Sequence, residues 1–340
     1  MKALVIEKQA IRDNIAVIRG KAGSAFLYAV LSGDGQGAGL IELATLCREC
    51  GIVRFAVNEP EDARRLREAG FVEEEILIDC NTVCTVGSAE TGAALNSLAA
   101  ARSTVVEAHV QVDTGMGLGG FPVEEPESIR LIFRNMPNVA VCGVYTQIHF
   151  VEGDNPQALE NLKAFETVLS QVCQDGYETG IIHIAGSYAA MTYDFAIQDA
   201  VRAGSVLMGR CRRTKGDKLT EVGYGEANLT ELRWLPKGHT IGARKAVTLK
   251  KPTRVAVLPV GYENGFGITA PGKEEGGLLS NLFFDRKNTV QVNGKKAKIL
   301  GVIGARETLV DVTDVTCAVG DPIRFEVEPM FARGLKRVYR

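Results

Sequence analysis

Residues 10 to about 210 alternate between helical and strand patterns, and this alternation is what most limits the folds open to the chain. Ile11, Ile15 and Ile18 share one helical face, and the apolar run 25–31 that follows has the length of a buried strand. The alternation continues to an expected last strand at 205–209. About eight strand–helix units over about 200 residues are what a (β/α)₈ barrel requires. We therefore predict a TIM-type barrel over residues 10–220.

The pattern changes after Gly209. Helical periodicity disappears, and short β-rich runs follow, separated by turn signals such as Asn293-Gly294. We predict a C-terminal all-β domain over residues 221–340, joined by a strand from residues 1–9. The segment 268–277, ITAPGKEEGG, has the composition of a loop.

Composition excludes several classes of function. A net charge of −2 and a pI near 6.2 give no reason to expect nucleic acid or an anionic membrane as a partner. No apolar run approaches the length of roughly twenty residues that a membrane span needs. We expect a cytoplasmic protein that binds a small molecule.

The cysteines and histidines do not predict a metal site. Cys47 and Cys50 form a C-x-x-C spacing, but they lie in an amphipathic helical pattern with no second pair at zinc spacing. His149 and His183 lie beside expected barrel strands without a second histidine or carboxylate at metal spacing. We expect all four side chains to be structural.

Several stretches, in order along the chain, resemble the motifs of the alanine racemase family. They are LYAVLSGDGQGAG, HVQVDTGMGLGGF, IHIAGSYAA, VRAGSVLMG, PTRVAVLPVGYENGFG, VNGKKAKILGVIGARETLVDVTDV and the terminal LKRVYR. The family counterparts are K-[AG]-[ND]-A-Y-G-H-G, VDTGMGRLGF, H-x-A-N-S-A-A, V-R-P-G-[IL]-x-[LM]-Y-G, VPVGYADGY, C-M-D-Q and PRVYR. The resemblance implies a barrel followed by a β-domain, and a homodimer.

The resemblance also implies chemistry based on pyridoxal 5′-phosphate, an electron sink that stabilises an amino-acid carbanion. The family uses a lysine for the cofactor imine and as one base, and a tyrosine from the partner subunit as the other. The matching positions here are Ser32 and Ala243, which can do neither. No lysine occurs between Lys21 and Lys163, and Lys245 is the nearest candidate for a displaced base.

Other family positions have changed as well. The arginine of VDTGMGR is replaced by Leu118, and the histidine that backs the pyridine ring by Gln147. Further replacements are Gln36 and Ala38 in the lysine motif, Gln111 before VDTG, and Ala305 and Arg306 for the Met-Asp pair at the substrate site.

A second set of positions is retained. The resemblance assigns the cofactor phosphate to Ser187, Gly204, Ser205 and Tyr339, and the pyridine nitrogen to Arg202. Tyr262 matches a tyrosine of the substrate entry.

These observations leave three functional hypotheses. The first is a protein without alanine racemase activity that binds pyridoxal phosphate or another phosphate-bearing ligand non-covalently. The second is an isomerase or other amino-acid enzyme with altered catalytic residues, for which Lys245, Asp34, Arg306 or a cysteine are candidates. The third is a regulatory partner of an active racemase, because a mixed dimer could not restore a complete two-base site.

Overall fold

The computed structural model of the chain describes residues 1–78, 85–147, 156–211, 218–241, 247–268 and 289–340. They form two compact units, one of residues 10–221 and one of residues 1–9 with 222–340. We call them the barrel unit and the β unit. No helix in the described ranges is long and apolar enough to cross a membrane.

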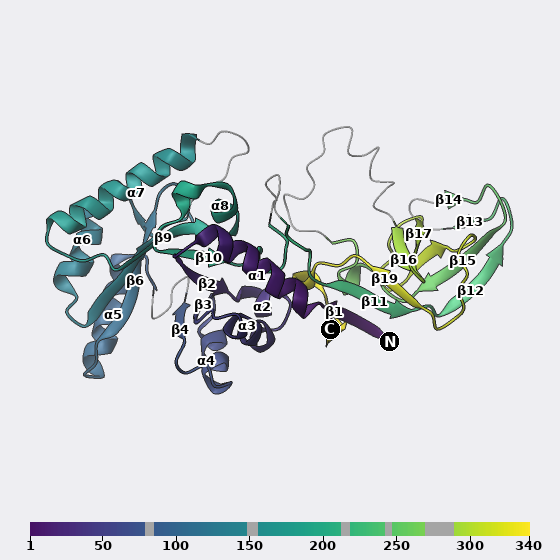
Figure 1. Ribbon diagram of the computed structural model, residues 1–340, viewed down its shortest axis with the longest axis horizontal. Helices are drawn as coiled ribbons and strands as arrows, with labels where there is room; N and C mark the ends of the chain where they lie inside the picture. Colours follow the sequence, from purple (N-terminus) through teal and green to yellow (C-terminus); the bar gives the residue numbers. More distant parts are fainter. Residues whose placement is uncertain (79–84, 148–155, 212–217, 242–246, 269–288) are drawn as a thin grey trace. The chain divides into compact units, whose positions relative to one another are not determined.

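The barrel unit is built on eight parallel strands, in the order β4-β3-β2-β10-β9-β8-β6-β5 (Figure 1). The strands are β2 (Phe26–Val30), β3 (Arg54–Val57), β4 (Glu75–Ile78), β5 (Thr85–Val86), β6 (Val106–Asp113), β8 (Val139–Tyr145), β9 (Ile181–Gly186) and β10 (Ala200–Ala203). The short β7 (Phe121–Pro122) pairs with β6. The predicted barrel is confirmed as a nearly closed one with β4 and β5 at the two ends of the sheet.

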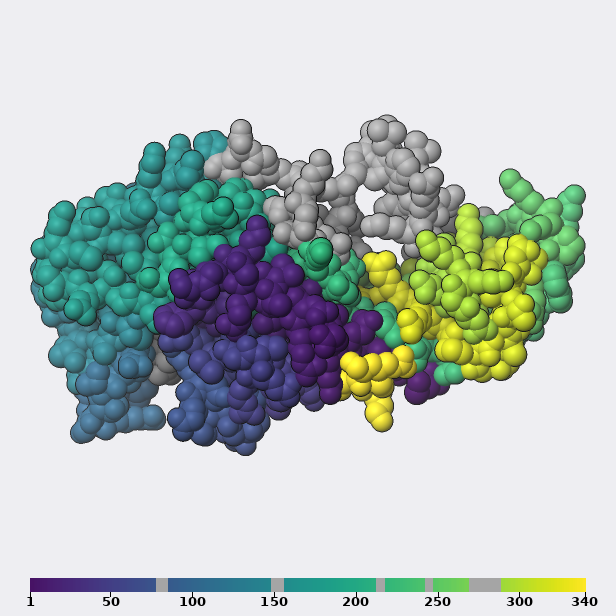
Figure 2. All heavy atoms as spheres, in the orientation of Figure 1, coloured from purple at the N-terminus to yellow at the C-terminus, as the bar shows by residue number. Residues whose placement is uncertain are grey.

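Helices connect these strands. They are α1 (Lys8–Ala22), α2 (Ser32–Gln36), α3 (Leu40–Glu49), α4 (Pro60–Glu68), α5 (Ala89–Ala101), α6 (Pro126–Asn135), α7 (Pro156–Gln174) and α8 (Ser187–Thr192), with a 3₁₀ turn at Asp194–Ala196. On the outside of the unit α1 lies beside α3, where Arg12 Nη2 is 2.8 Å from Glu49 Oε2 (Figure 2). The inner face of α1 buries Ile11, Ile15 and Ile18, as its periodicity predicts.

The expected strand at 205–209 is wrong, because the last barrel strand is β10, which ends at Ala203. Residues 205–209 form turns, in which Leu207 N donates to Gly204 O and Gly209 N donates to Val206 O. Val206, Leu207 and Met208 of this apolar run are buried. A short apolar run does not distinguish a buried strand from a buried turn.

The β unit contains a nine-stranded sheet in the order β12-β15-β18-β17-β16-β19-β11-β1-β20. The strands are β1 (Lys2–Ile6), β11 (Tyr224–Asn228), β12 (Glu231–Leu235), β15 (Thr253–Leu258), β16 (Thr289–Val292), β17 (Lys295–Leu300), β18 (Thr308–Asp311), β19 (Pro322–Phe325) and β20 (Lys336–Tyr339). A separate pair joins β13 (Thr240–Ile241) to β14 (Val247–Thr248), and 3₁₀ turns lie at Tyr262–Asn264 and Pro329–Phe331.

Two features of this unit follow from local chemistry. Asn293 and Gly294, with φ of 48° and 77°, make the two-residue turn between β16 and β17, since these residue types tolerate positive φ. The first strand, β1, pairs with β11 and β20, so the two ends of the chain lie in one sheet. All of the loop-like segment 268–277 except Ile268 lies outside the described residues.

Candidate functional site

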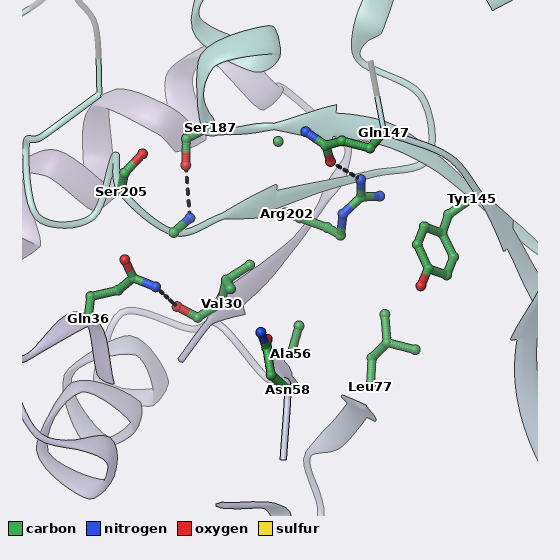
Figure 3. A pocket seen from close by; sticks show the side chains of 12 residues that line it. Val30, Gln36, Ala56, Asn58, Leu77, Tyr145, Gln147, Ser187, Arg202 and Ser205 are labelled. Carbon is green, nitrogen blue, oxygen red and sulfur yellow. Dashed lines mark hydrogen bonds between the residues drawn. The ribbon is translucent and has the colours of Figure 1, made fainter. Parts of the chain in front are cut away.

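A cavity of about 250 Å³ lies at the carboxyl ends of the barrel strands (Figure 3). In parallel α/β barrels this is the end that carries the functional site. The described residues that line it all belong to the barrel unit: Val30, Gln36, Ala56, Asn58, Leu77, Tyr145, Gln147, Gly186, Ser187, Arg202, Gly204 and Ser205. The cavity therefore brings together four of the five residues that the resemblance assigns to cofactor binding: Ser187, Arg202, Gly204 and Ser205.

Ser187 joins the ends of β9 and β10. Its Oγ accepts hydrogen bonds from Gly204 N at 2.9 Å and from Val206 N at 3.3 Å. A hydroxyl has two acceptor lone pairs and one donor hydrogen. Because two backbone N–H groups already occupy the acceptor side, Ser187 offers its O–H as a donor, which suits an anion.

Arg202 is the charged member of the lining, and only 7% of its surface is exposed. Its Nη1 lies 2.6 Å from His183 Nδ1 and donates to His183 O at 3.1 Å. Its Nη2 donates to Thr146 O at 2.8 Å and to Gln147 Oε1 at 2.5 Å. These partners are neutral acceptors, so the guanidinium keeps a positive charge beside the cavity.

Behind Arg202, His183 and His109 are buried and neutral. His183 Nε2 lies 2.9 Å from His109 Nδ1. Burial lowers the pKa of His109 to about 4, and burial followed by the charge of Arg202 lowers the pKa of His183 well below its usual value. Sequence reasoning missed this pair, because 74 residues separate the two histidines.

No group of three or more His, Cys, Asp or Glu side chains suited to a metal occurs within the described ranges. His183 accepts a hydrogen bond from Arg202, whereas His149 lies outside these ranges.

Ser32 begins a left-handed turn two residues after the last residue of β2. Gly33, Asp34, Gly35 and Gln36 all have positive φ, between 53° and 66°. Glycine adopts this region without a steric penalty, and alternate glycines in GDGQG make the turn accessible. Gln36 Nε2 lies 3.2 Å from Ser32 Oγ, so the residue at the lysine position of the family is held by a glutamine amide.

The other positions in the barrel unit are less involved. Leu118 does not line the cavity, and 69% of its surface is exposed. The loop before it is fixed by Asp113, whose Oδ1 accepts from the backbone N–H groups of Gly115, Met116 and Gly117. Ala38 is buried and Gln111 half-buried, and neither lines the cavity.

The remaining candidates belong to the β unit. Tyr262 N donates to Gly304 O at 2.9 Å and Glu263 N to Ala305 O at 3.1 Å, so the turn with Tyr262 packs against Ala305. Arg306 Nε lies 2.8 Å from Glu263 Oε2. The centroid of the Tyr339 ring lies 6.0 Å from Lys8 Nζ. Ala243 and Lys245 lie outside the described residues.

Sequence reasoning did not predict the apolar wall of the cavity or Asn58. Val30, Ala56, Leu77 and Tyr145 come from the ends of β2, β3, β4 and β8, and Asn58 directly follows β3. Their position at the carboxyl ends of predicted strands was the signal available.

The lining fits pyridoxal phosphate in part. Ser187, Ser205 and the charge of Arg202 suit a phosphate and an electron-rich ring nitrogen. Among the residues that the structure describes, no lysine lines the cavity, and Ser32 has no amine, so these residues do not fit a covalently attached cofactor.

Comparisons with known proteins agree with the motifs. Residues 6–211 match "Alanine racemase, N-terminal domain" and residues 222–328 match "Alanine racemase, C-terminal domain". An alanine racemase of Clostridium kluyveri is 26% identical over 332 residues, covering 91% of this chain and 81% of that protein.

Two crystal structures show the same fold. The alanine racemase of Streptomyces lavendulae has a TM-score of 0.85 at 21% identity, covering 100% of this chain and 97% of that one. That of Bartonella henselae, which carries covalently bound pyridoxal phosphate, has a TM-score of 0.81 at 20% identity, covering 100% and 99%. Since the two family domains together span most of its length, the chain belongs to the alanine racemase family.

Proposed function

We propose that this chain is a member of the alanine racemase family that does not racemise alanine, and that it binds pyridoxal phosphate or another phosphate-bearing ligand non-covalently. The observation that carries the proposal is Ser32 at the end of β2. Its hydroxyl cannot form an imine, and none of the described residues that line the cavity is a lysine. A racemase that works with two bases also needs a second one, and the matching residue is Ala243.

The anion-binding half of the proposal depends on charge and hydrogen bonding. Arg202 supplies a positive charge beside the cavity. Ser187 supplies an O–H donor, because its oxygen already accepts hydrogen bonds from two backbone N–H groups. Charge-assisted hydrogen bonds to a phosphate are roughly twice as strong as neutral ones. A phosphate-bearing ligand thus gains affinity here without a covalent bond.

The test is incubation of the purified chain with pyridoxal phosphate, followed by visible spectra with and without borohydride. We expect no borohydride-stable label at the cavity and no alanine racemisation. Racemisation that depends on added pyridoxal phosphate, or a reduced adduct mapped to a peptide of the barrel, would refute the proposal. Ser32→Lys is the matched control, in which an amine at position 32 allows such an adduct.

The location and the assembly are further parts of the proposal. We expect a cytoplasmic protein. We also expect a homodimer, because the motif resemblance implies a dimer. Sedimentation of the purified chain measures its mass directly, and a monomer at micromolar concentration contradicts this part alone. Copurification with a lysine-bearing homologue would instead favour a regulatory partner.

A further inference from the structure

The amide of Gln36 is fixed in one orientation. Its Nε2 lies 3.3 Å from Val30 O, 3.3 Å from Ser32 O and 3.2 Å from Ser32 Oγ. Backbone carbonyls only accept hydrogen bonds, so the NH₂ group must face them. The amide oxygen, Oε1, consequently points away from Val30, towards the side of the cavity where Ser205 lies (Figure 3).

The amide of Gln147 is fixed in the opposite sense. Arg202 Nη2 lies 2.5 Å from Gln147 Oε1, and a guanidinium has donors only. The Nε2 group therefore faces the other way and lies 3.1 Å from the position of a Cβ built on Gly186, another lining residue. Gln147 thus presents N–H donors to the cavity.

With these two orientations, the lining of the cavity presents one hydrogen-bond acceptor beside several hydrogen-bond donors. Ser187 and Gln147 offer donors to a ligand and Arg202 adds its positive charge, whereas Gln36 offers its carbonyl oxygen. Gln36 lies at the phosphate end, since its Nε2 is 3.6 Å from a Cβ built on Gly204. No residue in the described part of the chain donates to Gln36 Oε1. A phosphate oxygen beside it would be repelled, but a ligand hydroxyl would donate to it.

We propose that the cavity takes the phosphate ester of a polyhydroxylated carbon chain, such as a sugar or polyol phosphate, in preference to pyridoxal phosphate. The proposal rests on the proposed function, namely that the site holds a phosphate-bearing ligand. A hydroxyl both donates and accepts, so it pairs with Gln36 Oε1 as well as with Gln147 Nε2. Pyridoxal phosphate carries no hydroxyl next to its phosphate-bearing methylene, and it leaves Gln36 Oε1 unpaired.

The opposite wall fits the same ligand class. Val30, Ala56 and Leu77 are aliphatic members of the lining, and Ala56 and Leu77 lie on the opposite side of the cavity from Gln147 (Figure 3). A polyol chain has C–H groups for such a wall and hydroxyls for the amides. Aliphatic burial with a few placed polar groups is typical of small-ligand sites.

The experiment compares glycerol 3-phosphate with propyl phosphate, which has the same carbon chain without hydroxyls. Isothermal titration of the full chain should give at least about tenfold tighter binding for glycerol 3-phosphate, the effect of one hydrogen bond to an otherwise unpaired acceptor. Gln36→Met should reduce this ratio to near one, because glycerol 3-phosphate loses the acceptor for its hydroxyl, whereas propyl phosphate has no hydroxyl. Pyridoxal phosphate should bind the wild type more weakly than glycerol 3-phosphate.

A second variant guards against a folding defect. Gln147→Met should also reduce the ratio, while leaving the turn at Gln36 intact, and far-ultraviolet circular dichroism checks both variants. Equal affinity for the two esters, or tighter binding of pyridoxal phosphate that Gln36→Met does not change, overturns the inference and leaves the proposed function standing. If inorganic phosphate, pyridoxal phosphate and both esters all fail to bind, the proposed function fails as well.

Discussion

Arg202 Nη1 lies 2.6 Å from His183 Nδ1, and this contact determines the tautomers of both buried histidines. A guanidinium can only donate, so Nδ1 of His183 is the acceptor and its Nε2 carries the hydrogen. That hydrogen points to His109 Nδ1, 2.9 Å away, which leaves the hydrogen of His109 on Nε2. A proton added to either ring would break the chain of donors and would lie close to the charge of Arg202.

The stability of the barrel unit should therefore depend on pH. Both pKa values are lowered in the folded protein, that of His109 from 6.5 to about 4, so protons bind preferentially to the unfolded chain. The contribution of the neutral histidines to the stability of the barrel unit is complete above pH 6.5 and is lost as the pH falls from 6.5 towards 4. Each histidine adds a slope of up to about 1.4 kcal/mol per pH unit. Urea unfolding, followed by circular dichroism between pH 7.5 and pH 4.5, measures this slope of the unfolding free energy against pH.

His109→Asn is the variant that isolates one of these two groups. The amide oxygen of asparagine can accept the hydrogen bond from His183 Nε2, but asparagine does not titrate. The slope of the unfolding free energy against pH should therefore decrease. A slope equal to that of the wild type would show that His109 does not contribute, contrary to its 2% exposure and its contact with His183.

Ser187→Ala should lower both stability and phosphate affinity. Ser187 Oγ accepts from Gly204 N and Val206 N, and its loss leaves two N–H groups without that partner. We expect the free energy of unfolding to fall by about 1–3 kcal/mol and phosphate to bind at least about tenfold more weakly. Urea unfolding and calorimetric titration with inorganic phosphate measure the two effects.

Ser205→Ala is the matched control for Ser187. The Ser205 hydroxyl lines the same cavity and makes no hydrogen bond to the residues that the structure describes. Its removal should weaken phosphate binding with little change in stability. If Ser187→Ala reduces stability but leaves phosphate binding unchanged, Ser187 only ties β9 to β10.

The C-x-x-C spacing leads to a prediction about thiol reactivity. Burial raises the pKa of the Cys47 thiol, and burial raises that of Cys50 too, so neither is a ready nucleophile. Cys173 is exposed. In the native chain iodoacetamide should label Cys173 at least about tenfold faster than Cys47, as mass spectrometry of peptides measures. Rapid labelling of Cys47, or a Cys47–Cys50 disulfide under mild oxidation, would contradict a structural role.

The barrel was predictable because each of its elements carries a local signal. The period of α1 and the apolar run of β2 recur along the unit, and right-handed crossovers leave few topologies for such a chain. The end of β10 was not predictable. Its position depends on the capture of two backbone N–H groups by Ser187, which is a tertiary contact.

The candidate site was predictable where a motif includes both a barrel strand and the residues that follow it. Ser187 and Gly204 follow β9 and β10, which pair directly, so their motifs had to meet. The amide orientation of Gln36 depends on local partners, the oxygens of Val30 and Ser32, within the left-handed turn. The orientation of Gln147 was not predictable, because it depends on Arg202, which is 55 residues away in the sequence and which only the folded barrel brings within hydrogen-bond distance. The pairing of His109 with His183 has the same cause.

Two glycines between α7 and β9 allow the free-energy cost of a backbone clash to be measured separately from the cost of a left-handed conformation. Gly176 and Gly180 both have left-handed φ, 85° and 66°. A Cβ on Gly176 would meet nothing within 4 Å, whereas a Cβ on Gly180 would lie 2.1 Å from Cys142 O in β8. Gly176→Ala should therefore cost only the left-handed conformation, about 1 kcal/mol. Gly180→Ala should cost at least about 3 kcal/mol, because the pairing of β8 with β9 must shift. Urea unfolding of the two variants gives the difference, and equal costs would mean that the connection between α7 and β9 moves aside without disturbing the barrel.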